Sequence, residues 1–313
     1  MTENDKAQIR DLGDEVYLID TYMADYDGIT AAYLIRSERP CLIETGTARS
    51  APAVIKALSY LGVGPHDLAT IVVTHIHLDH AGGVGDIAAA FPDAEIVVHE
   101  RGAKHLADPK RLLASAGQIY GPVLEEVFGL LRPTDAARIQ AVDEVDVIDL
   151  GGGRTLTSYH SPGHAKHHLG LLDSATGDLY VGDAAGLYMP ETGTMKPATP
   201  PPDFDLDSSL RSLGLFRQLA PARLLFSHFG PARHTSDALE RAAEELRLWV
   251  DAVRLSRATT PELEHAVAAV RDRTRARYAD LAAMPDVDAK FEALNSTETN
   301  VAGILRWLDK TKG

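Results

Sequence analysis

Three histidines and one aspartate fall within positions 75–80, in the order His-Ile-His-Leu-Asp-His. The residues before them, 71–74, are apolar enough to form a buried strand. Residues two apart in an extended segment point to the same side, so His75 and His77 can converge on one metal ion. Asp79 and His80 lie where the chain turns into a predicted helix, and they can reach a second ion. The motif therefore predicts ligands for a pair of metal ions.

Three further candidate ligands each follow a predicted strand. His164 comes after 155–160, Asp183 after 179–181, and His228 after 224–226. Ligands delivered just past the carboxyl ends of several strands are what a site along one sheet edge requires. A single histidine is more often a hydrogen-bonded structural residue, but packing does not call for four polar groups after a buried strand. The expected ligands are His75, His77, Asp79, His80, His164, Asp183 and His228.

Imidazole nitrogens and carboxylate oxygens suit divalent zinc, iron or manganese, and zinc is the metal we expect. Two such ions lower the pKa of a shared water from 15.7 to about 7, which gives a hydroxide nucleophile at neutral pH. Asp79 or Asp183 can orient this hydroxide toward a carbonyl or phosphoryl centre that is polarised by one metal. No serine or cysteine nucleophile is needed. We expect a hydrolase that cleaves an ester, a thioester or a lactone.

The elements that carry these residues alternate between strands and helices. Short β-branched runs between turn signals predict strands at 15–20, 32–36, 41–44, 70–74, 95–99, 145–149, 155–160, 168–172, 179–181 and 224–227. Helical spacing predicts helices at 51–61, 83–91, 123–131 and 206–219. This order of elements indicates a layered α/β domain and excludes an all-β sandwich.

Three stretches stand apart from this pattern. Residues 101–142 interrupt the strand series and are expected to form an excursion over one face. The proline-rich stretch 190–202 is expected to be an ordered surface loop. After residue 231 the strand patterns stop, and helical spacing recurs at 239–253, 260–270 and 301–308. The expected domains are a catalytic domain, 1–233, and a helical extension packed on it, 234–313.

The seven residues resemble the ligand pattern of the metallo-β-lactamase superfamily, which is His-x-His-x-Asp-His followed by a distant His, Asp and His. The resemblance covers about residues 14–231, roughly a domain's length. It implies an αββα four-layer sandwich with a dimetal site at one edge, between the two sheets. It also implies that His75, His77 and His164 bind the first metal, that Asp79, His80 and His228 bind the second, and that Asp183 bridges them.

Differences from the ligand patterns of particular subfamilies limit the branches of the superfamily that this sequence resembles. The commonest true β-lactamases have a cysteine in place of Asp183, and flavodiiron oxygen reductases have a glutamate in place of His77. What remains resembles hydroxyacylglutathione hydrolases and acyl-homoserine lactonases, in which an early strand often ends in Asp-Thr-Gly. Here the strand ends in Glu44-Thr45-Gly46, which leaves the supporting role of Glu44 open.

Two other functions stay open. One is a binding or regulatory protein that keeps the metal site, and the other is a diiron redox enzyme, against which the intact His77 argues. His167 and His168 could support the ligand His164 or contact substrate, or could form a plain surface pair. Arg271, Arg273, Arg275 and Arg277 could bind an anionic group, although their alternation places them on two helix faces and favours a solvated surface.

Composition limits the partners. The 313 residues carry a net charge of −14, which would repel a nucleic acid backbone. No membrane-spanning run occurs, and the polar, acidic stretch 1–10 does not resemble a signal peptide. The single cysteine, Cys41, rules out an intramolecular disulfide. We expect a cytoplasmic enzyme with a small-molecule substrate and neither a nucleic acid nor a membrane as partner.

Overall fold

The computed structural model describes residues 9–311, and the chain forms two compact units. Unit 1 comprises the described part of Met1–His160 together with Leu169–Tyr180, and unit 2 comprises Ser161–His168 and the described part of Val181–Gly313. Most of the stretch 1–10, from which a signal peptide was excluded by composition, lies outside the described residues.

Unit 1 contains a seven-stranded sheet whose strands are in chain order from β1 to β7. The strands are β1 (Ile9–Gly13), β2 (Val16–Asp20), β3 (Ala31–Ile35), β4 (Cys41–Ile43), β5 (Thr70–Val72), β6 (Glu95–His99) and β7 (Ile139–Val142). Neighbours from β1 to β4 are antiparallel, whereas those from β4 to β7 are parallel. The parallel strands end at one edge of the sheet, so the loop at 75–80 leaves from that edge, as do the residues after β4 and β6.

A second sheet has six strands in the order β15-β14-β11-β10-β9-β8. They are β8 (Val145–Asp149), β9 (Thr155–His160), β10 (Leu169–Asp173), β11 (Asp178–Gly182), β14 (Arg223–Phe226) and β15 (Gly230–Ala232). Within unit 1 the two sheets are in contact. The buried rings of Tyr33 on β3 and Tyr180 on β11 pack edge to face, with centroids 5.2 Å apart. The core of unit 1 therefore lies between two sheets.

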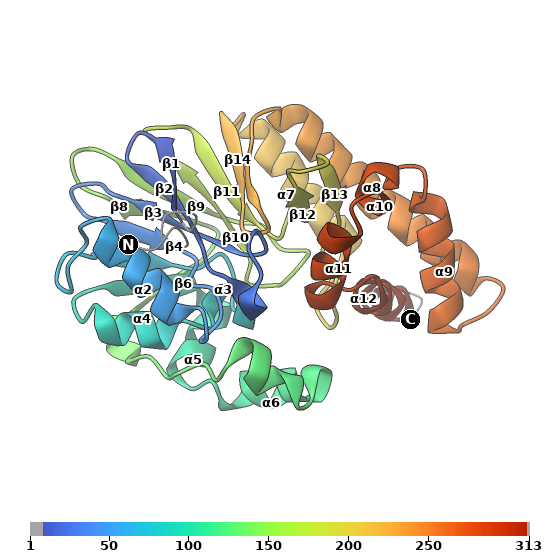
Figure 1. Cartoon of the computed structure of the whole chain (residues 1–313), viewed down its shortest axis with the longest axis horizontal. Coiled ribbons are helices and arrows are strands. Elements are labelled where there is room, and N and C mark those ends of the chain that lie inside the picture. The colour runs from blue at the N-terminus through green and yellow to red at the C-terminus, as the bar shows by residue number, and fades with distance from the viewer. Residues whose placement is uncertain (1–8, 312–313) are drawn as a thin grey trace. The chain divides into compact units, whose positions relative to one another are not determined.

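The helices of unit 1 flank the seven-stranded sheet. They are α2 (Ala51–Tyr60), α3 (Leu78–Ala81), α4 (Val84–Ala90), α5 (Glu100–Ala107) and α6 (Lys110–Tyr120), with short turns η1 (Met23–Asp25), η2 (Leu124–Phe128) and η3 (Ala136–Arg138). Helices α2 and α4 pack against each other (Figure 1). In α2 the buried positions Ala51, Val54, Ala57 and Leu58 form one apolar stripe, which is why this helix covers a sheet face.

Unit 2 is mainly helical. It contains α7 (Leu206–Gln218), α8 (Thr235–Arg257), α9 (Leu263–Thr274), α10 (Ala279–Ala282), α11 (Pro285–Leu294) and α12 (Thr297–Lys310), and a small hairpin of β12 (Leu187–Met189) and β13 (Thr194–Lys196). Helices α9 and α12 both pack on the long α8 (Figure 1). Among residues 9–311, no helix has the length and apolar character needed to cross a membrane.

The α/β class is confirmed, and the ten predicted strands correspond to β2–β6, β8–β11 and β14. The prediction of an excursion at 101–142 is wrong at its end, because β7 pairs with β6 at the edge of the sheet. The predicted helix at 123–131 is confirmed at Leu124–Phe128, which form the short π-helix η2, and is wrong after Phe128. Gly121 and Gly129, both with positive φ, delimit η2.

The prediction of a surface loop at 190–202 is also wrong in its middle. Residues 194–199 are buried, and three of them form β13. A three-residue strand shows no alternation, and its buried Lys196 is an unusual strand residue that a pattern does not predict. Strands β12 and β15 and helix α10 were likewise too short to predict, and the longer β1 and α11 were missed as well.

The buried ion pair between Arg154 and Asp173 generates a stability prediction for unit 1. Arg154 Nε donates to Asp173 Oδ1 at 3.0 Å, a second guanidinium nitrogen contacts the other carboxylate oxygen, and the Asp173 side chain is fully buried. Asp173→Ala would leave a mostly buried guanidinium without its counter-ion. We expect a loss of about 3–5 kcal/mol in the free energy of unfolding, measured by urea denaturation.

The control for this prediction is the exposed pair of Arg39 and Asp149, whose nitrogen and oxygen lie 3.4 Å apart. Arg39→Gln should change the free energy of unfolding by less than about 1 kcal/mol, because solvent screens the pair. Equal effects of the two substitutions would contradict the assignment of Arg154 and Asp173 as a stabilising buried pair.

Candidate metal centre

Unit 1 brings together four of the expected ligands at the end of β5. His75 Nε2 lies 3.0 Å from His77 Nδ1, and the His75 and His80 rings have centroids 4.0 Å apart. His80 Nε2 lies 3.5 Å from Asp79 Oδ2. His75 and His80 are buried, whereas 23% of the Asp79 side-chain surface is exposed to solvent. We call these four residues the unit 1 cluster.

Oxygen atoms face the outer nitrogens of two rings in this cluster, through a hydrogen bond at His75 and an ion-pair contact at His80. The Thr74 hydroxyl lies 2.9 Å from His75 Nδ1, which leaves Nε2 on the side of His77. The Glu44 carboxylate lies 3.4 Å from His80 Nδ1, and it also accepts a hydrogen bond from the Thr74 backbone N–H at 3.2 Å. An oxygen partner on one imidazole nitrogen is the usual companion of a metal on the other. Glu44 thus occupies the supporting position that the sequence left open.

Unit 2 brings together the other three expected ligands around Asp183, which follows β11. Asp183 Oδ2 lies 3.5 Å from His164 Nε2, and Asp183 Oδ1 lies 3.5 Å from His228 Nε2. All three side chains are buried. One carboxylate therefore presents a different oxygen to each of two imidazoles. We call these three residues the unit 2 cluster.

Backbone and side-chain partners orient the unit 2 cluster. His164 Nδ1 donates to the backbone carbonyl of Ala198 at 3.0 Å, so its Nε2 faces Asp183. His168 is fully buried, and its Nε2 accepts a hydrogen bond from the Asp183 backbone N–H at 3.1 Å. Its proton is therefore on Nδ1, which donates to Ser161 Oγ at 2.8 Å. His168 fixes the loop that carries His164 to the backbone of Asp183.

Helix α7 holds the loop 161–164 in place. The Asp205 side chain caps α7 by accepting from the Ser208 N–H, and the Asp205 N–H donates to Gly163 O at 2.9 Å. The hydroxyl of Ser212 donates to Pro162 O at 2.7 Å. A Cβ on Gly163 would lie 2.4 Å from the Ser209 backbone nitrogen, and φ at Gly163 is 139°. Only glycine allows the loop to approach the helix this closely.

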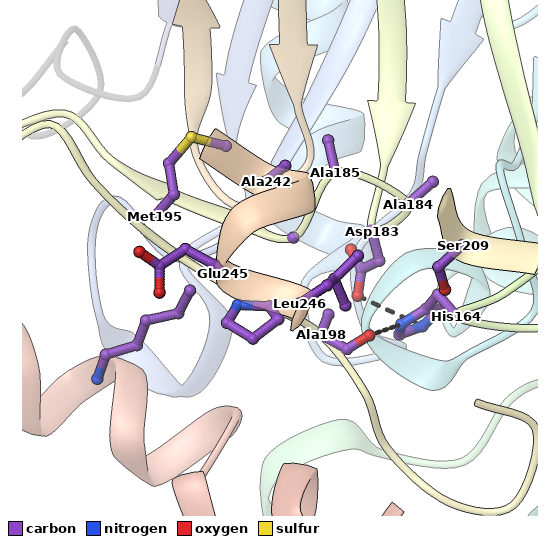
Figure 2. Close-up of a pocket in the computed structure, with 13 residues that line it drawn as sticks. His164, Asp183, Ala184, Ala185, Met195, Ala198, Ser209, Ala242, Glu245 and Leu246 are labelled. Atoms are coloured by element: carbon purple, nitrogen blue, oxygen red, sulfur yellow. Dashed lines mark hydrogen bonds and ion pairs between the residues drawn. The ribbon is translucent and has the colours of Figure 1, made fainter. Parts of the chain in front are cut away.

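Figure 2 shows the pocket in unit 2 that His164 and Asp183 line together with residues of β13 and α8. Its volume is about 10 Å³, which is room for about one water molecule. Met195, Ala242 and Leu246 also line it, with Met195 on the side away from His164. This face of the unit 2 cluster is packed protein and has no space for a substrate.

The donor set fits divalent metal ions. The described residues of both units include histidine and aspartate groups able to bind metal. Their imidazole and carboxylate donors suit zinc, iron or manganese. His75, His80 and His164 each have an oxygen beside one ring nitrogen, and at His164 the oxygen is a carbonyl, which can only accept and therefore leaves Nε2 unprotonated for a metal. Both units thus contribute histidine and aspartate donors of the kind that can bind divalent metal ions.

Several residues that support the clusters have no clear sequence signal. The partner of His164 is the backbone carbonyl of Ala198, which lies in a proline-rich stretch. The sequence predicts Thr74 only as the last residue of a strand. At Tyr120, at the end of α6, burial and then the charge of the Asp79 carboxylate raise the pKa of the hydroxyl. Its ring also packs on Phe128, with centroids 4.6 Å apart. The interrupted helical pattern of 101–142 gave no indication that this segment reaches the unit 1 cluster.

Residues 25–228 match the family model of the metallo-beta-lactamase superfamily. The chain belongs to this superfamily. It is 30% identical over 210 residues to the metallo-beta-lactamase fold-containing protein ST1585 of Sulfurisphaera tokodaii, a match that covers 66% of this chain and 75% of that protein. The solved structure of ST1585 matches with a TM-score of 0.64 over 74% of this chain and 86% of the other.

A second solved structure extends the shared fold to almost the whole chain. The metallo-beta-lactamase family protein TTHA1429 of Thermus thermophilus is 19% identical and covers 96% of this chain and 95% of its own, with a TM-score of 0.69. At this identity the likeness concerns the fold alone. The helices after Thr235 are thus part of a fold that another superfamily member has.

The relatives by sequence include enzymes with named activities. Acyl-coenzyme A thioesterase MBLAC2 of Gallus gallus is 31% identical over 191 residues, which cover 55% of this chain and 63% of that protein. Other matches are named as an N-acyl homoserine lactonase, hydroxyacylglutathione hydrolases and a putative diflavin flavoprotein. Superfamily members are therefore mostly hydrolases of esters and thioesters, but some are other enzymes.

The contact between His168 and Asp183 generates a prediction about metal affinity. His168→Ala would remove the acceptor of the Asp183 N–H and release the loop at 161–164. We expect zinc affinity, measured by competition with a chromophoric chelator, to fall about 10- to 100-fold. His168→Gln should keep most of the affinity, because its amide oxygen can accept the same hydrogen bond.

His265→Ala is the matched control, since it removes an exposed imidazole on α9. It should leave zinc affinity unchanged. Wild-type affinity in His168→Ala would show that His168 does not position the ligands.

Proposed function

We propose that the two clusters bind two divalent metal ions and that the chain is a hydrolase of ester, thioester or lactone bonds. In this proposal His75, His77 and His164 hold one ion, Asp79, His80 and His228 hold the other, and Asp183 bridges the two. The observation that carries it is the carboxylate of Asp183, whose two oxygens each face a different imidazole at 3.5 Å. A carboxylate placed in this way is suited to bridge two ions.

Two ions bound there would acidify a water molecule and polarise the scissile carbonyl. The protein's own part is to orient that water and to exclude competing groups. Asp79 is the more accessible of the two carboxylates, since its side chain keeps 23% exposure against 7% for Asp183. It is therefore the one that can accept a hydrogen bond from the attacking water and hold its proton.

The state of the one cysteine supports hydrolysis by water rather than by a thiolate nucleophile. The single cysteine, Cys41, lies within β4 and is fully buried, and burial raises the pKa of its thiol well above the ordinary range. It is neither accessible nor ionised at neutral pH. The thioesterase and lactonase names of relatives favour a carbonyl substrate with a sulfur or oxygen leaving group.

The first test couples metal content to turnover. His77→Ala and Asp183→Ala should each bind less zinc, measured by elemental analysis, and should lower kcat/KM by at least about a hundredfold. His265→Ala should behave as the wild type. Wild-type metal content and turnover in either ligand variant would overturn the proposal.

A second test identifies the bond that is cleaved. A panel of an aryl acetate, an acyl thioester and an acyl lactone is offered to the zinc-loaded protein, before and after dialysis against a chelator. We expect turnover of at least one of them, its loss on chelation and its return with added zinc. A fully loaded protein that turns over none would instead be a binding protein. No hydrolysis of the panel, together with a visible absorption band after iron reconstitution, would instead support the diiron redox alternative.

A further inference from the structure

A cavity of about 280 Å³ lies among the helices of unit 2, where no function has been assigned. Its walls come from α8, α9, α10 and α11, the start of α12, and Lys196 of β13. The apolar part of its lining includes Trp249, Val270 and Leu281, each almost fully buried. Its volume is just below the range of about 300–1,000 Å³ that is common for small-molecule pockets, so the cavity suits a compact ligand.

The charged groups of the cavity fall into two sets. Asp288 and Glu292 both bond to the buried Lys196, with Nζ–O distances of 2.7 and 3.0 Å, so these three charges largely satisfy one another. Arg271 and Arg275 also line the cavity. They are four residues apart along α9 and its C-cap and hence share one side.

The two arginines are the groups left to meet a ligand's charge. Both are exposed, and Arg275 makes a solvent-exposed pair with Asp272 at 2.8 Å, which is easily exchanged. Among residues 9–311, no ion pair of Arg271 is observed. Two guanidinium groups beside an apolar floor are complementary to a carboxylate or phosphate that carries an apolar chain.

We propose that this cavity is a binding site for a small amphipathic anion, whose carboxylate or phosphate meets Arg271 and Arg275 and whose apolar chain packs on Tyr278 and Ala282, which line the cavity and keep exposed surface. The site is already shaped by internal hydrogen bonds. Trp249 Nε1 donates to the Tyr278 hydroxyl at 3.0 Å, and that hydroxyl donates to Glu245 at 2.7 Å. The indole is therefore fixed in the wall before any ligand arrives.

Three consecutive residues connect this cavity with the unit 2 cluster. Lys196 lines the cavity, and it also lines the small pocket beside His164. Two residues on, the carbonyl of Ala198 accepts the hydrogen bond from His164 Nδ1. A ligand in the cavity thus touches the segment that orients a candidate metal ligand.

The experiment uses Trp249 as the reporter. The chain has two tryptophans, so the full-length protein with Trp307→Phe reports on Trp249 alone. Octanoate and octyl phosphate are titrated separately. Octanol serves as a control that has the apolar chain without the charge, and inorganic phosphate as a control that has the charge without the chain. We expect saturable changes in emission with octanoate, octyl phosphate or both, at concentrations at least about tenfold lower than with octanol or inorganic phosphate. Which of the two binds more tightly identifies the head group.

Matched variants locate the site. Arg271→Gln combined with Arg275→Gln should raise the Kd at least about tenfold, whereas Arg273→Gln, which removes a charge from α9 away from the cavity, should not. Ala282→Phe, at an exposed position of the lining, should weaken binding without changing charge. Equal binding of octanol, equal binding of inorganic phosphate, or equal effects of Arg273→Gln and the double variant would each overturn the proposal. None of these measurements depends on turnover, so their outcome is independent of whether the chain is a hydrolase.

Discussion

An imidazole can bind a metal only if one nitrogen is unprotonated and points at the ion, and this constraint shapes both clusters. The protein meets it by giving the other nitrogen an oxygen partner: a hydroxyl for His75, a carboxylate for His80 and a backbone carbonyl for His164. Each partner comes from a different segment of the chain. The ligands are consequently only as well oriented as the segments around them are packed.

That packing depends on close backbone approaches at the ends of strands. A Cβ on Gly82, just after the unit 1 cluster, would lie 2.9 Å from the Ala48 backbone nitrogen, so this glycine lets the turn after His80 pack on the loop at 45–48. Gly163 does the same in unit 2 by allowing the His164 loop to touch the first turn of α7. The His80 carbonyl accepts the Thr45 N–H at 2.8 Å, which fixes the turn to the residues after β4. Ligand loops at a sheet edge are thus held by backbone contacts more than by side chains.

The sequence was informative where a residue type has few alternative explanations. Three imidazoles and a carboxylate after an apolar strand predict metal chemistry, and β-branched runs of five residues predicted strands such as β3 and β6 correctly. The roles of Thr74, Ala198 and Tyr120 could not be predicted, because each depends on a contact made by the fold rather than on residue type. Short elements such as β7 and β13 were missed because three or four residues show no period and because, unlike β4 and residues 224–226 of β14, these two contain a polar residue inside or at the end of the run. The assignment of each ligand to a particular ion, and the domain boundary at 233, stay predictions.

The segment 194–199 shows how the helices of unit 2 bear on the ligands. Lys196 is held by two carboxylates of α11, and the Thr199 hydroxyl donates to the Asn300 carbonyl of α12 at 3.0 Å. A Cβ on Gly303 would overlap the Thr199 carbonyl, so α12 and this segment are in close contact. Between these two anchors lies Ala198, whose carbonyl orients His164. The helical part of unit 2 is therefore not an inert appendage: it holds in place the backbone group on which the direction of a candidate metal ligand depends.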